Sequence, residues 1–349
     1  MEGDAAVHEH RSFSQLFLTG RLINAILAAV FGVLLNLVVL VGVVRVSTYQ
    51  LKSYRYIVGC ITAVDLLFAL VAGLVVPGFD FDNGFLAMIT GPITLLNSPE
   101  LSRYTYIAYN LIYYAYFLLQ PVTFVCRYFT ICRPKIASYL NTKPVLYGAI
   151  LATVVYGIVQ AYVIQSMNQV TTVTFSYINA DTNEAIFTNA HYLTQHNADP
   201  VLFQIEMVLY MVLLVLVFLV MFFCSLKIFF YLRKNANHFS TRTVEAHKKL
   251  TLALILQAVF PILTGVVPSI VCMCLFFTAK ADSRILWYTL VFHIWQPVIS
   301  PLITLVFVTP IRTAVVNIVA RKKMVTVVKA TNSYYNRDSA LKSQNASQM

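Results

Sequence analysis

The sequence predicts an all-α membrane protein: a bundle of seven transmembrane helices with its amino terminus outside the cell and its carboxyl terminus in the cytoplasm. Three observations predict this class, namely the composition, the number of long apolar segments and the distribution of positive charge. Hydrophobic residues make up 59% of the 349 residues and charged residues 11%, against roughly 45–50% and about 25% in soluble domains. A soluble protein of 349 residues cannot bury so much apolar surface in its core. The composition therefore argues against a soluble enzyme, a disordered chain or a secreted disulfide scaffold.

Seven apolar segments are long enough to cross the membrane, since a helix needs about 20 residues for a hydrocarbon layer of about 30 Å. The predicted spans, numbered one to seven in chain order, are 22–44, 56–77, 104–126, 144–164, 201–226, 250–277 and 285–308. The apolar segment 85–96 is shorter, and Gly91-Pro92 interrupts it. Because lipid-exposed backbone must satisfy its own hydrogen bonds, we expect this segment in an extracellular loop.

The positive charge predicts the orientation. With the amino terminus outside, the cytoplasmic segments hold nineteen of the 25 Lys and Arg residues and the extracellular segments hold five. These cytoplasmic segments are 45–55, 127–143, 233–249 and 310–349. Cytoplasmic loops of membrane proteins carry such an excess of Lys and Arg. The net charge of +11 is therefore interpreted as a sign of topology, and no nucleic-acid partner is expected.

The remaining segments are short. Residues 1–21 are expected to form an extracellular amino terminus, 22–308 the transmembrane domain, and 309–349 a polar cytoplasmic tail that is disordered after about residue 329. Residues 1–20 lack the apolar run of a signal peptide, so span one is expected to act as an uncleaved anchor. The six cysteines lack the spacing of a metal site, and neither a metal nor a cofactor is expected.

Two polar residues lie deep in the first two spans. An ionisable group in mid-bilayer costs more than about 2.5 kcal/mol, so it needs a partner or a function. Asp65 lies about two turns into span two, and Asn36 lies at a similar depth in span one. Two interpretations stay open. One is a polar network between spans one, two and seven that holds a cation or exchanges its hydrogen-bond partners on activation. The other is a static hydrogen bond between helices.

Span three carries tyrosines at helical spacing. One face of the helix presents Tyr106, Tyr109, Tyr113, Tyr116 and Gln120. Tyrosine is common at membrane interfaces, which accounts for Tyr104 and Tyr106. The deeper Tyr113 and Tyr116 need a hydroxyl partner in the bundle or a ligand. The residues predicted to line a ligand pocket are Tyr109, Tyr113, Tyr116, Glu206, His293 and Gln296. Glu206, near the outer end of span five, is also placed to reach the lipid headgroups.

The last two spans contain pairs of prolines. Pro261 and Pro268 lie in span six, and Pro297 and Pro301 lie in span seven. Proline removes a backbone donor and bends a helix. These bends favour a hinge, although proline is also tolerated in membrane helices without any such role.

Several motifs resemble the plan of G-protein-coupled receptors. They are Leu35-Asn36, Val64-Asp65-Leu66-Leu67-Phe68, Cys126-Arg127-Tyr128 and Ser300-Pro301-Leu302-Ile303-Thr304. The resemblance matches Arg127 to the arginine of an Asp-Arg-Tyr motif and Ser300-Pro301 to an Asn-Pro motif. The sequence departs from this plan at three places. Cys126 replaces the acid of the Asp-Arg-Tyr motif, and neither of the first two extracellular loops contains a Cys for the usual disulfide. Span seven contains no lysine that could bind retinal.

A second set of motifs is similar to nematode serpentine chemoreceptors of the Str-type superfamily. It comprises Phe124-Val125-Cys126-Arg127-Tyr128-Phe129, His247-Lys248-Lys249-Leu250 with Ala253-Leu254, Gln257, Pro261 and Pro268, and Pro310-Ile311-Arg312. The resemblance runs along essentially all seven spans. It implies a plasma-membrane chemosensory receptor of sensory cilia that binds a small odorant-like molecule in the outer half of the bundle, among spans three, five, six and seven.

The same resemblance implies a signalling mechanism. The sixth helix would swing outward and admit a heterotrimeric G protein at a cleft formed by Arg127, Tyr128, Lys248 and Lys249. Glu245 is the only acid in the three cytoplasmic loops, and we expect it to restrain Arg127 in the resting state.

Three alternatives stay open. A ligand-gated channel of the insect odorant-receptor type would place the amino terminus inside, against the charge distribution. A transporter should contain an internal repeat or broken helices, which the sequence does not reveal. An intramembrane enzyme needs catalytic groups at matched depth, whereas Asp65 and Glu206 are predicted near opposite faces of the membrane. His8-Glu9-His10 lies in the predicted soluble tail, where we expect it to have no role. The protein is therefore not expected to be an enzyme.

Overall fold

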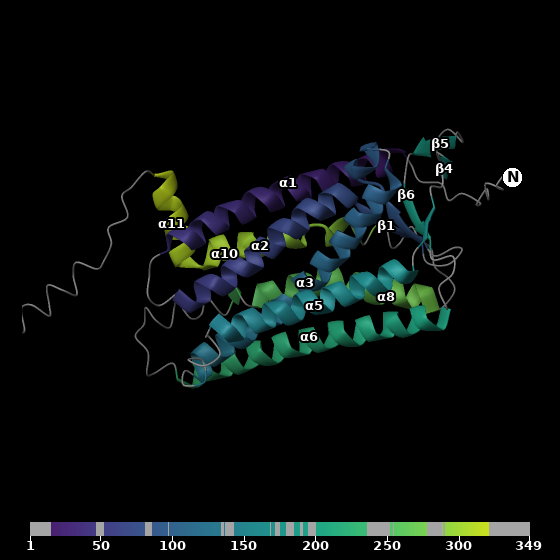
Figure 1. Cartoon of the computed structure of the whole chain (residues 1–349). Helices are drawn as coiled ribbons and strands as arrows, with labels where there is room; N and C mark the ends of the chain where they lie inside the picture. The colour runs from purple at the N-terminus through teal and green to yellow at the C-terminus, as the bar shows by residue number, and fades with distance from the viewer. Residues whose placement is uncertain are drawn as a thin grey trace, which may run out of the picture.

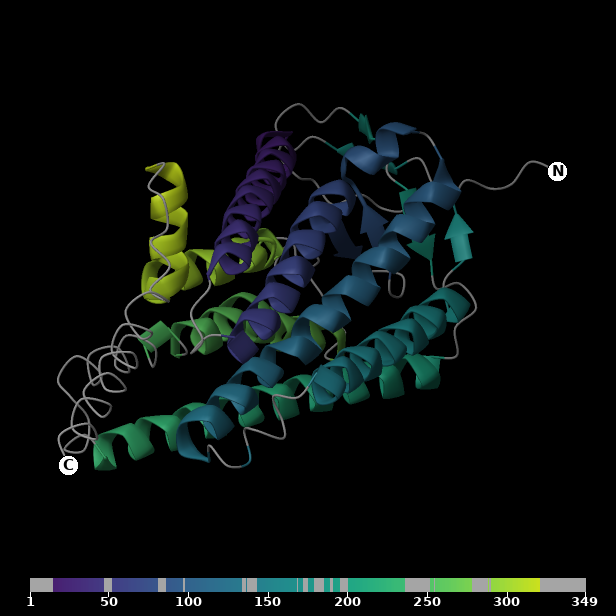
Figure 2. The ribbon, with the colours of Figure 1, turned by 60° about the vertical axis from the view of Figure 1, so that its left-hand side comes forward.

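The computed structural model describes the greater part of the chain. The described residues are 15–46, 52–80, 86–96, 98–133, 136, 143–167, 169–171, 175–178, 185–188, 191–194, 200–235, 252–253, 255–277, 288 and 290–320. The long helices among them are α1 (Gln15–Arg45), α2 (Lys52–Val75), α3 (Pro99–Cys132), α5 (Lys143–Met167) and α6 (Pro200–Lys234). They run alongside the segments that contain α8 (Val267–Phe277) and α10 (Gln296–Phe307), and together these helices form one bundle (Figure 1 and Figure 2).

The helices fall on the predicted spans. Of the described residues, four helical segments are each long and apolar enough to cross a membrane: Thr19–Arg45, Arg55–Val75, Glu100–Cys132 and Val208–Lys234. Spans four and six are represented by the shorter apolar stretches Ile150–Gln160 and Ile255–Val271. Span seven contains α10, and a bend of 89° separates α10 from α11 (Thr309–Val319).

Small residues and exposed apolar faces both suit a bundle in lipid. A Cβ added at Gly32 of α1 would lie 2.8 Å from the Cβ of Ala69 on α2, so only a glycine allows these two helices to approach as they do. On the outside, Val212, Leu216 and Leu219 of α6 are each more than half exposed. Such a surface costs little against hydrocarbon, because lipid tails are as apolar as the side chains.

A four-stranded antiparallel sheet lies at the end of the bundle opposite α11 (Figure 1). Its order is β1 (Pro77–Asp80), β2 (Leu86–Ile89), β6 (His191–Thr194) and β3 (Gln169–Thr171), and a separate pair is formed by β4 (Phe175–Ile178) and β5 (Ala185–Thr188). The apolar segment 85–96 supplies β2 and the 3₁₀ helix η2 (Pro92–Leu96), so its described residues do not form a membrane-crossing helix.

The last two spans depart from regular α-helix near their prolines. In span six a π-helical turn, η4 (Ile262–Val266), lies between Pro261 and Pro268. In span seven a turn at residues 294–295 precedes α10, and Pro297 occupies its first turn. Proline cannot donate a backbone hydrogen bond, and π-turns within α-helices are rare and frequent at functional sites. Both irregular regions lie at mid-bundle.

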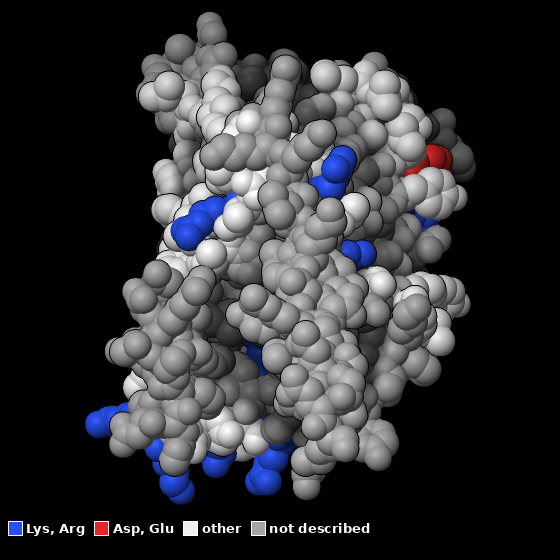
Figure 3. Space-filling view, turned by 90° about the vertical axis from the view of Figure 1, so that its left-hand side faces the viewer, with Lys and Arg blue, Asp and Glu red and all other residues white. Residues whose placement is uncertain are grey.

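Lys and Arg side chains gather at the end of the bundle that carries α11. Figure 3 looks onto this end, where basic side chains are spread over the described surface. The described basic residues here include Arg45 at the end of α1, Arg233 and Lys234 at the end of α6, and Arg312 on α11. The sequence predicts that this end faces the cytoplasm.

Candidate functional site

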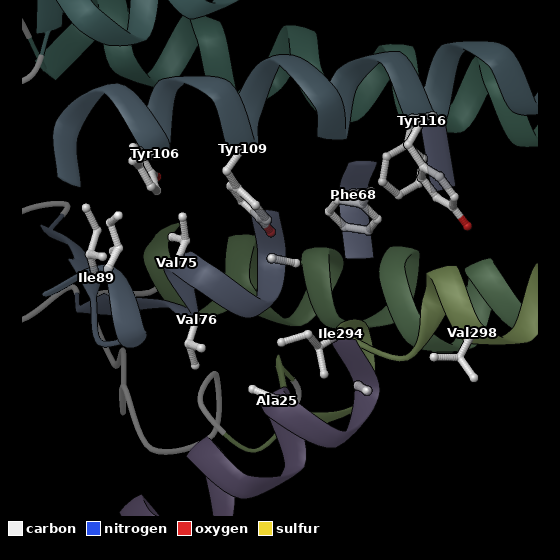
Figure 4. Close-up of a cluster of buried hydrophobic side chains, with 14 of the residues drawn as sticks. Ala25, Phe68, Val75, Val76, Ile89, Tyr106, Tyr109, Tyr116, Ile294 and Val298 are labelled. Carbon is white, nitrogen blue, oxygen red and sulfur yellow. The ribbon is translucent and has the colours of Figure 1, made fainter. Parts of the chain in front are cut away.

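The tyrosines of α3 surround one phenylalanine of α2. Phe68 is fully buried, and its ring centroid lies 5.8 Å from that of Tyr109, 5.9 Å from Tyr113 and 5.2 Å from Tyr116. Figure 4 shows Tyr109 and Tyr116 reaching from α3 toward Phe68. Aromatic pairs at such separations stabilise a core beyond the area that they bury. We call these four residues, with His293, the aromatic cluster.

His293 and Tyr113 connect the aromatic cluster to further helices. The His293 ring lies 5.3 Å from the ring of Tyr113 and 6.1 Å from that of Phe68, and its Nδ1 lies 3.3 Å from the carbonyl oxygen of Thr264 in the π-turn. The hydroxyls of Tyr113 and Tyr210 are hydrogen-bonded at 2.7 Å, which joins α3 to α6. The aromatic cluster therefore contacts spans two, three, five, six and seven.

A small cavity of about 20 Å³ lies on the outer side of the aromatic cluster, and we call it the outer cavity. Spans one, two, three and seven form its walls. Its lining consists of Arg21, Asn24, Ala25, Ala72, Val76, Pro77, Tyr109, Leu290, Val291, His293 and Ile294. The walls thus combine apolar surface with a few polar groups, which is typical of sites for small molecules.

Arg21 is a buried cation in the wall of the outer cavity. Its guanidinium donates hydrogen bonds to the carbonyl of Val76 and the hydroxyl of Thr90, both at 3.3 Å, and to the carbonyl of Pro77. Val76 joins α2 to β1 with a φ of 42°, a conformation that β-branched residues rarely adopt. The hydroxyl of Thr90 also donates to Val76, at 2.8 Å. These bonds hold the sheet against the first helix.

Asn24 links the first helix to the seventh span on another side of the outer cavity. Its amide donates to the carbonyl of Val291 at 3.2 Å, and its oxygen accepts a hydrogen bond of 3.0 Å from the indole N–H of Trp295. Both ends of the Asn24 amide are therefore used to fix the position of span seven beside His293.

The deep polar residues converge on span seven. The Asn36 amide donates to the carbonyl oxygens of Gly32 and Pro297, both at 2.8 Å. Asp65 is 1% exposed and shares a side-chain hydrogen bond with Ser300. Asn36 thus joins span one to span seven at Pro297, and Asp65 joins span two to span seven at Ser300.

A second cavity, the inner cavity, lies below the aromatic cluster between spans three, six and seven, with a volume of about 10 Å³. Its lining consists of Tyr116, Gln120, Gln257, Phe260, Pro261, Thr264, Gln296, Ile299, Ser300 and Ile303. The Gln257 amide donates to the Thr304 hydroxyl at 3.4 Å, and Tyr116 shares a side-chain hydrogen bond with Gln120. Half of the residues that line the inner cavity have polar side chains, whereas most of the residues that line the outer cavity are apolar.

At the basic end of the bundle, Arg127 is 5% exposed near the end of α3. Its neighbour Tyr128 packs against a cluster formed by Phe124, Met221 and Ile228. The predicted partners of Arg127 at the start of span six, Glu245, Lys248 and Lys249, lie outside the described residues.

Comparison with known proteins agrees with this architecture. Residues 22–316 match the model of the family of serpentine-type seven-transmembrane G-protein-coupled chemoreceptors, class Str. The chain belongs to this family. No curated protein matches the sequence. The family match covers all seven predicted spans. This Str chemoreceptor is therefore a multi-pass, seven-helix membrane protein and a chemosensory receptor. Its family is not a family of enzymes.

The predicted pocket residues of the Str receptor divide between the two cavities. Tyr109 and His293 line the outer cavity, Tyr116 and Gln296 line the inner cavity, and Tyr113 lies in the aromatic cluster between them. Glu206 belongs to α6, but its side chain lies outside the described residues. The contacts that Phe68, Arg21, Asn24 and Tyr210 make at this site were not predicted from the sequence. Arg21 could have been noticed, because it is a lone basic residue at the outer edge of an apolar span.

Proposed function

We propose that this Str chemoreceptor binds a small odorant-like molecule at the outer cavity and the aromatic cluster, and that binding activates a heterotrimeric G protein through movement of the sixth helix. Tyr109, Tyr113 and His293 would contact the ligand, Glu206 would approach it from span five, and Tyr116 and Gln296 would form the floor of the pocket. A cavity of about 20 Å³ favours a ligand of few atoms, admitted by a local rearrangement of side chains.

The position of His293 carries this proposal. Its ring contacts the aromatic cluster, while its Nδ1 approaches the carbonyl of Thr264 in the π-turn of span six. A ligand that moves the His293 ring would change this contact, and it can favour the active arrangement only by binding that arrangement more tightly. Pro261 and Pro268, which bracket the π-turn, are the proposed hinge.

At the inner end, the same movement would open a cleft beside Arg127 and Tyr128. The basic third loop, with Lys248 and Lys249, would form the other side of this cleft, and Glu245 would close it at rest. Asn36, Asp65, Ser300 and Pro301 are proposed to adjust their contacts as span seven follows. The proposed location is the plasma membrane, in sensory cilia.

The test measures G-protein dissociation in a cell line during exposure to a panel of volatile compounds. Ligand-dependent dissociation is expected, and His293→Ala should abolish it, whereas Phe292→Ala should not, because Phe292 is 64% exposed on the outside of the bundle. Equal loss in both variants at matched surface expression would contradict the role of His293. An ionic current without dissociation would favour the alternative of a ligand-gated channel, and ligand uptake would favour a transporter.

A further inference from the structure

The side chain of Gln296 is buried without the hydrogen bonds that it needs. It is 2% exposed, and neither its amide nitrogen nor its oxygen has a partner among the residues that the structure describes. A glutamine amide offers two donors and an acceptor with two lone pairs. Burying such a group without partners costs free energy, and lipid around the bundle supplies none. A partner must therefore come from inside the bundle.

The inner cavity is where that partner can lie. Gln296 lines it together with polar side chains from all three surrounding spans, including Gln120 of α3, Gln257 and Thr264 of span six, and Ser300 of α10. A buried water needs roughly 10–15 Å³ of space and two to four polar partners. The inner cavity, at about 10 Å³, provides both. A molecule with several heavy atoms would not fit in the same space.

Gly265 explains how the amide reaches this position. A Cβ at residue 265 would lie 2.5 Å from the Nε2 of Gln296 and 3.3 Å from the Cζ of Phe117. Any larger residue would therefore displace Gln296 or separate the two spans. The π-turn, which contains Gly265, thus leaves space for the Gln296 amide beside the inner cavity.

We propose that the inner cavity binds a single buried water molecule, which hydrogen-bonds Gln296 and bridges span seven to spans three and six. This hydration site goes beyond ligand binding and G-protein coupling, because it follows from Gln296 and the cavity alone. It makes a water molecule part of the contact between spans six and seven at the level of the π-turn.

The test is X-ray radiolytic footprinting of the full-length receptor in lipid nanodiscs. Radiolysis of a bound water produces hydroxyl radicals in place, and these modify side chains that touch the water. Tyr116 lines the inner cavity and is 2% exposed, whereas the equally buried Tyr106 (3%) and Phe124 (0%) line neither cavity. Tyr116 should be modified several times faster than both controls. Equal rates in the unaltered receptor would overturn the proposal without recourse to any variant.

The Gln296→Leu variant tests the role of the amide, because leucine has a similar volume and no hydrogen-bonding atoms. The modification rate of Tyr116 should fall to that of Phe124. Leu302→Ala, on the same helix but 48% exposed toward lipid, should leave the rate of Tyr116 unchanged. Size-exclusion chromatography identifies folded receptor for each variant. Persistent rapid modification of Tyr116 in folded Gln296→Leu would show that Gln296 holds no water there.

Discussion

Arg21 joins the first helix to the sheet that covers the outer end of the bundle. Its guanidinium donates to three oxygens near the junction of α2 and β1, including the carbonyl of Val76, whose backbone has the unusual φ of 42°. Hydrogen bonds from charged groups stabilise a fold by about 1.5–3 kcal/mol. The Arg21 side chain is thus placed both to fix the sheet and to present positive charge to the outer cavity.

The Arg21→Met variant should lower the free energy of unfolding by about 2 kcal/mol, because methionine keeps the apolar stem and loses the charged donors. Thermal denaturation of the purified receptor measures this change as a lower midpoint. Lys227→Met is the matched control, since Lys227 is exposed on α6 with its Nζ 5.3 Å from the ring centroid of Phe223. An equal midpoint for Arg21→Met and the unaltered receptor would contradict the structural role of Arg21.

The hydrogen bond between Tyr113 and Tyr210 gives a second prediction at the residue scale. Tyr113→Phe and Tyr210→Phe should each destabilise the receptor by about 1 kcal/mol, because each removes one partner of the same 2.7 Å bond. The double variant should then be little worse than either single variant, since contacting residues are not additive. Thermal denaturation of all four proteins forms the cycle. Additive losses would mean that the two hydroxyls do not depend on each other.

Some residues of the candidate site could be predicted from the sequence, and others could not. The common face of Tyr109, Tyr113 and Tyr116 follows from helical spacing, so it could be predicted. Phe68 could not, because its contact with that face depends on how α2 is rotated against α3. The assignment of Tyr106 to the membrane interface was wrong. Tyr106 is 3% exposed and packs in a core that includes Ile89 of β2, whereas Tyr104, also assigned to the interface, is 60% exposed.

At the scale of elements, two contacts hold span six against span seven, one within the π-turn and one before it. His293 approaches the carbonyl of Thr264, and Gln257 donates to the hydroxyl of Thr304. Next to Thr264, Gly265 permits the close approach of Gln296. This arrangement would keep the sixth helix near the seventh until the ligand or the G protein favours another state.

Gly265→Ala should weaken that arrangement and raise basal G-protein signalling. The added methyl group would displace the Gln296 amide, whose Nε2 would lie only 2.5 Å from it, and would press on the ring of Phe117. Gly148→Ala on α5 is the control, because a Cβ there meets nothing within 4 Å and alanine favours helix by up to about 1 kcal/mol. Basal dissociation of the G protein is measured at matched surface expression. The same basal level in both variants would contradict a restraining role for the π-turn.

Elements were predicted with uneven success, for physical reasons. Long apolar spans are visible because the bilayer demands about 20 residues per helix. The strands are only three or four residues long and pair across distant loops, so no local pattern predicts their register. The prolines of span six indicated irregular backbone, but proline alone does not distinguish a bend from a π-turn.

For the whole molecule, the orientation in the membrane is the prediction that decides which end can meet a ligand. The basic end carries α11, and the sheet covers the opposite end (Figure 1 and Figure 3). An epitope tag at the amino terminus should be stained on intact cells, and one at the carboxyl terminus only after permeabilisation. The positive-inside rule gives the physical reason. A cytoplasmic amino terminus would reverse the two ends and bring the channel alternative forward.

The resting state of the whole receptor depends on how the buried charge at its inner end is balanced. Arg127 is 5% exposed, and taking a cation out of water is costly unless hydrogen bonds or an opposite charge compensate for it. Glu245 is the only acid in the three cytoplasmic loops and directly precedes span six, so it is the proposed restraint. Glu245→Ala should then raise basal G-protein dissociation, and Glu245→Gln should raise it too, because both remove the charge.

Asp338→Ala, which removes the other predicted cytoplasmic acid, is the control for a general effect of charge and should leave basal dissociation unchanged. If Glu245→Ala and Asp338→Ala signal equally at matched surface expression, Glu245 does not restrain Arg127. A rise that is confined to the Glu245 variants would connect Arg127 to the start of the sixth helix. The proposed movement of that helix would then have a restraint at its inner end as well as at the π-turn.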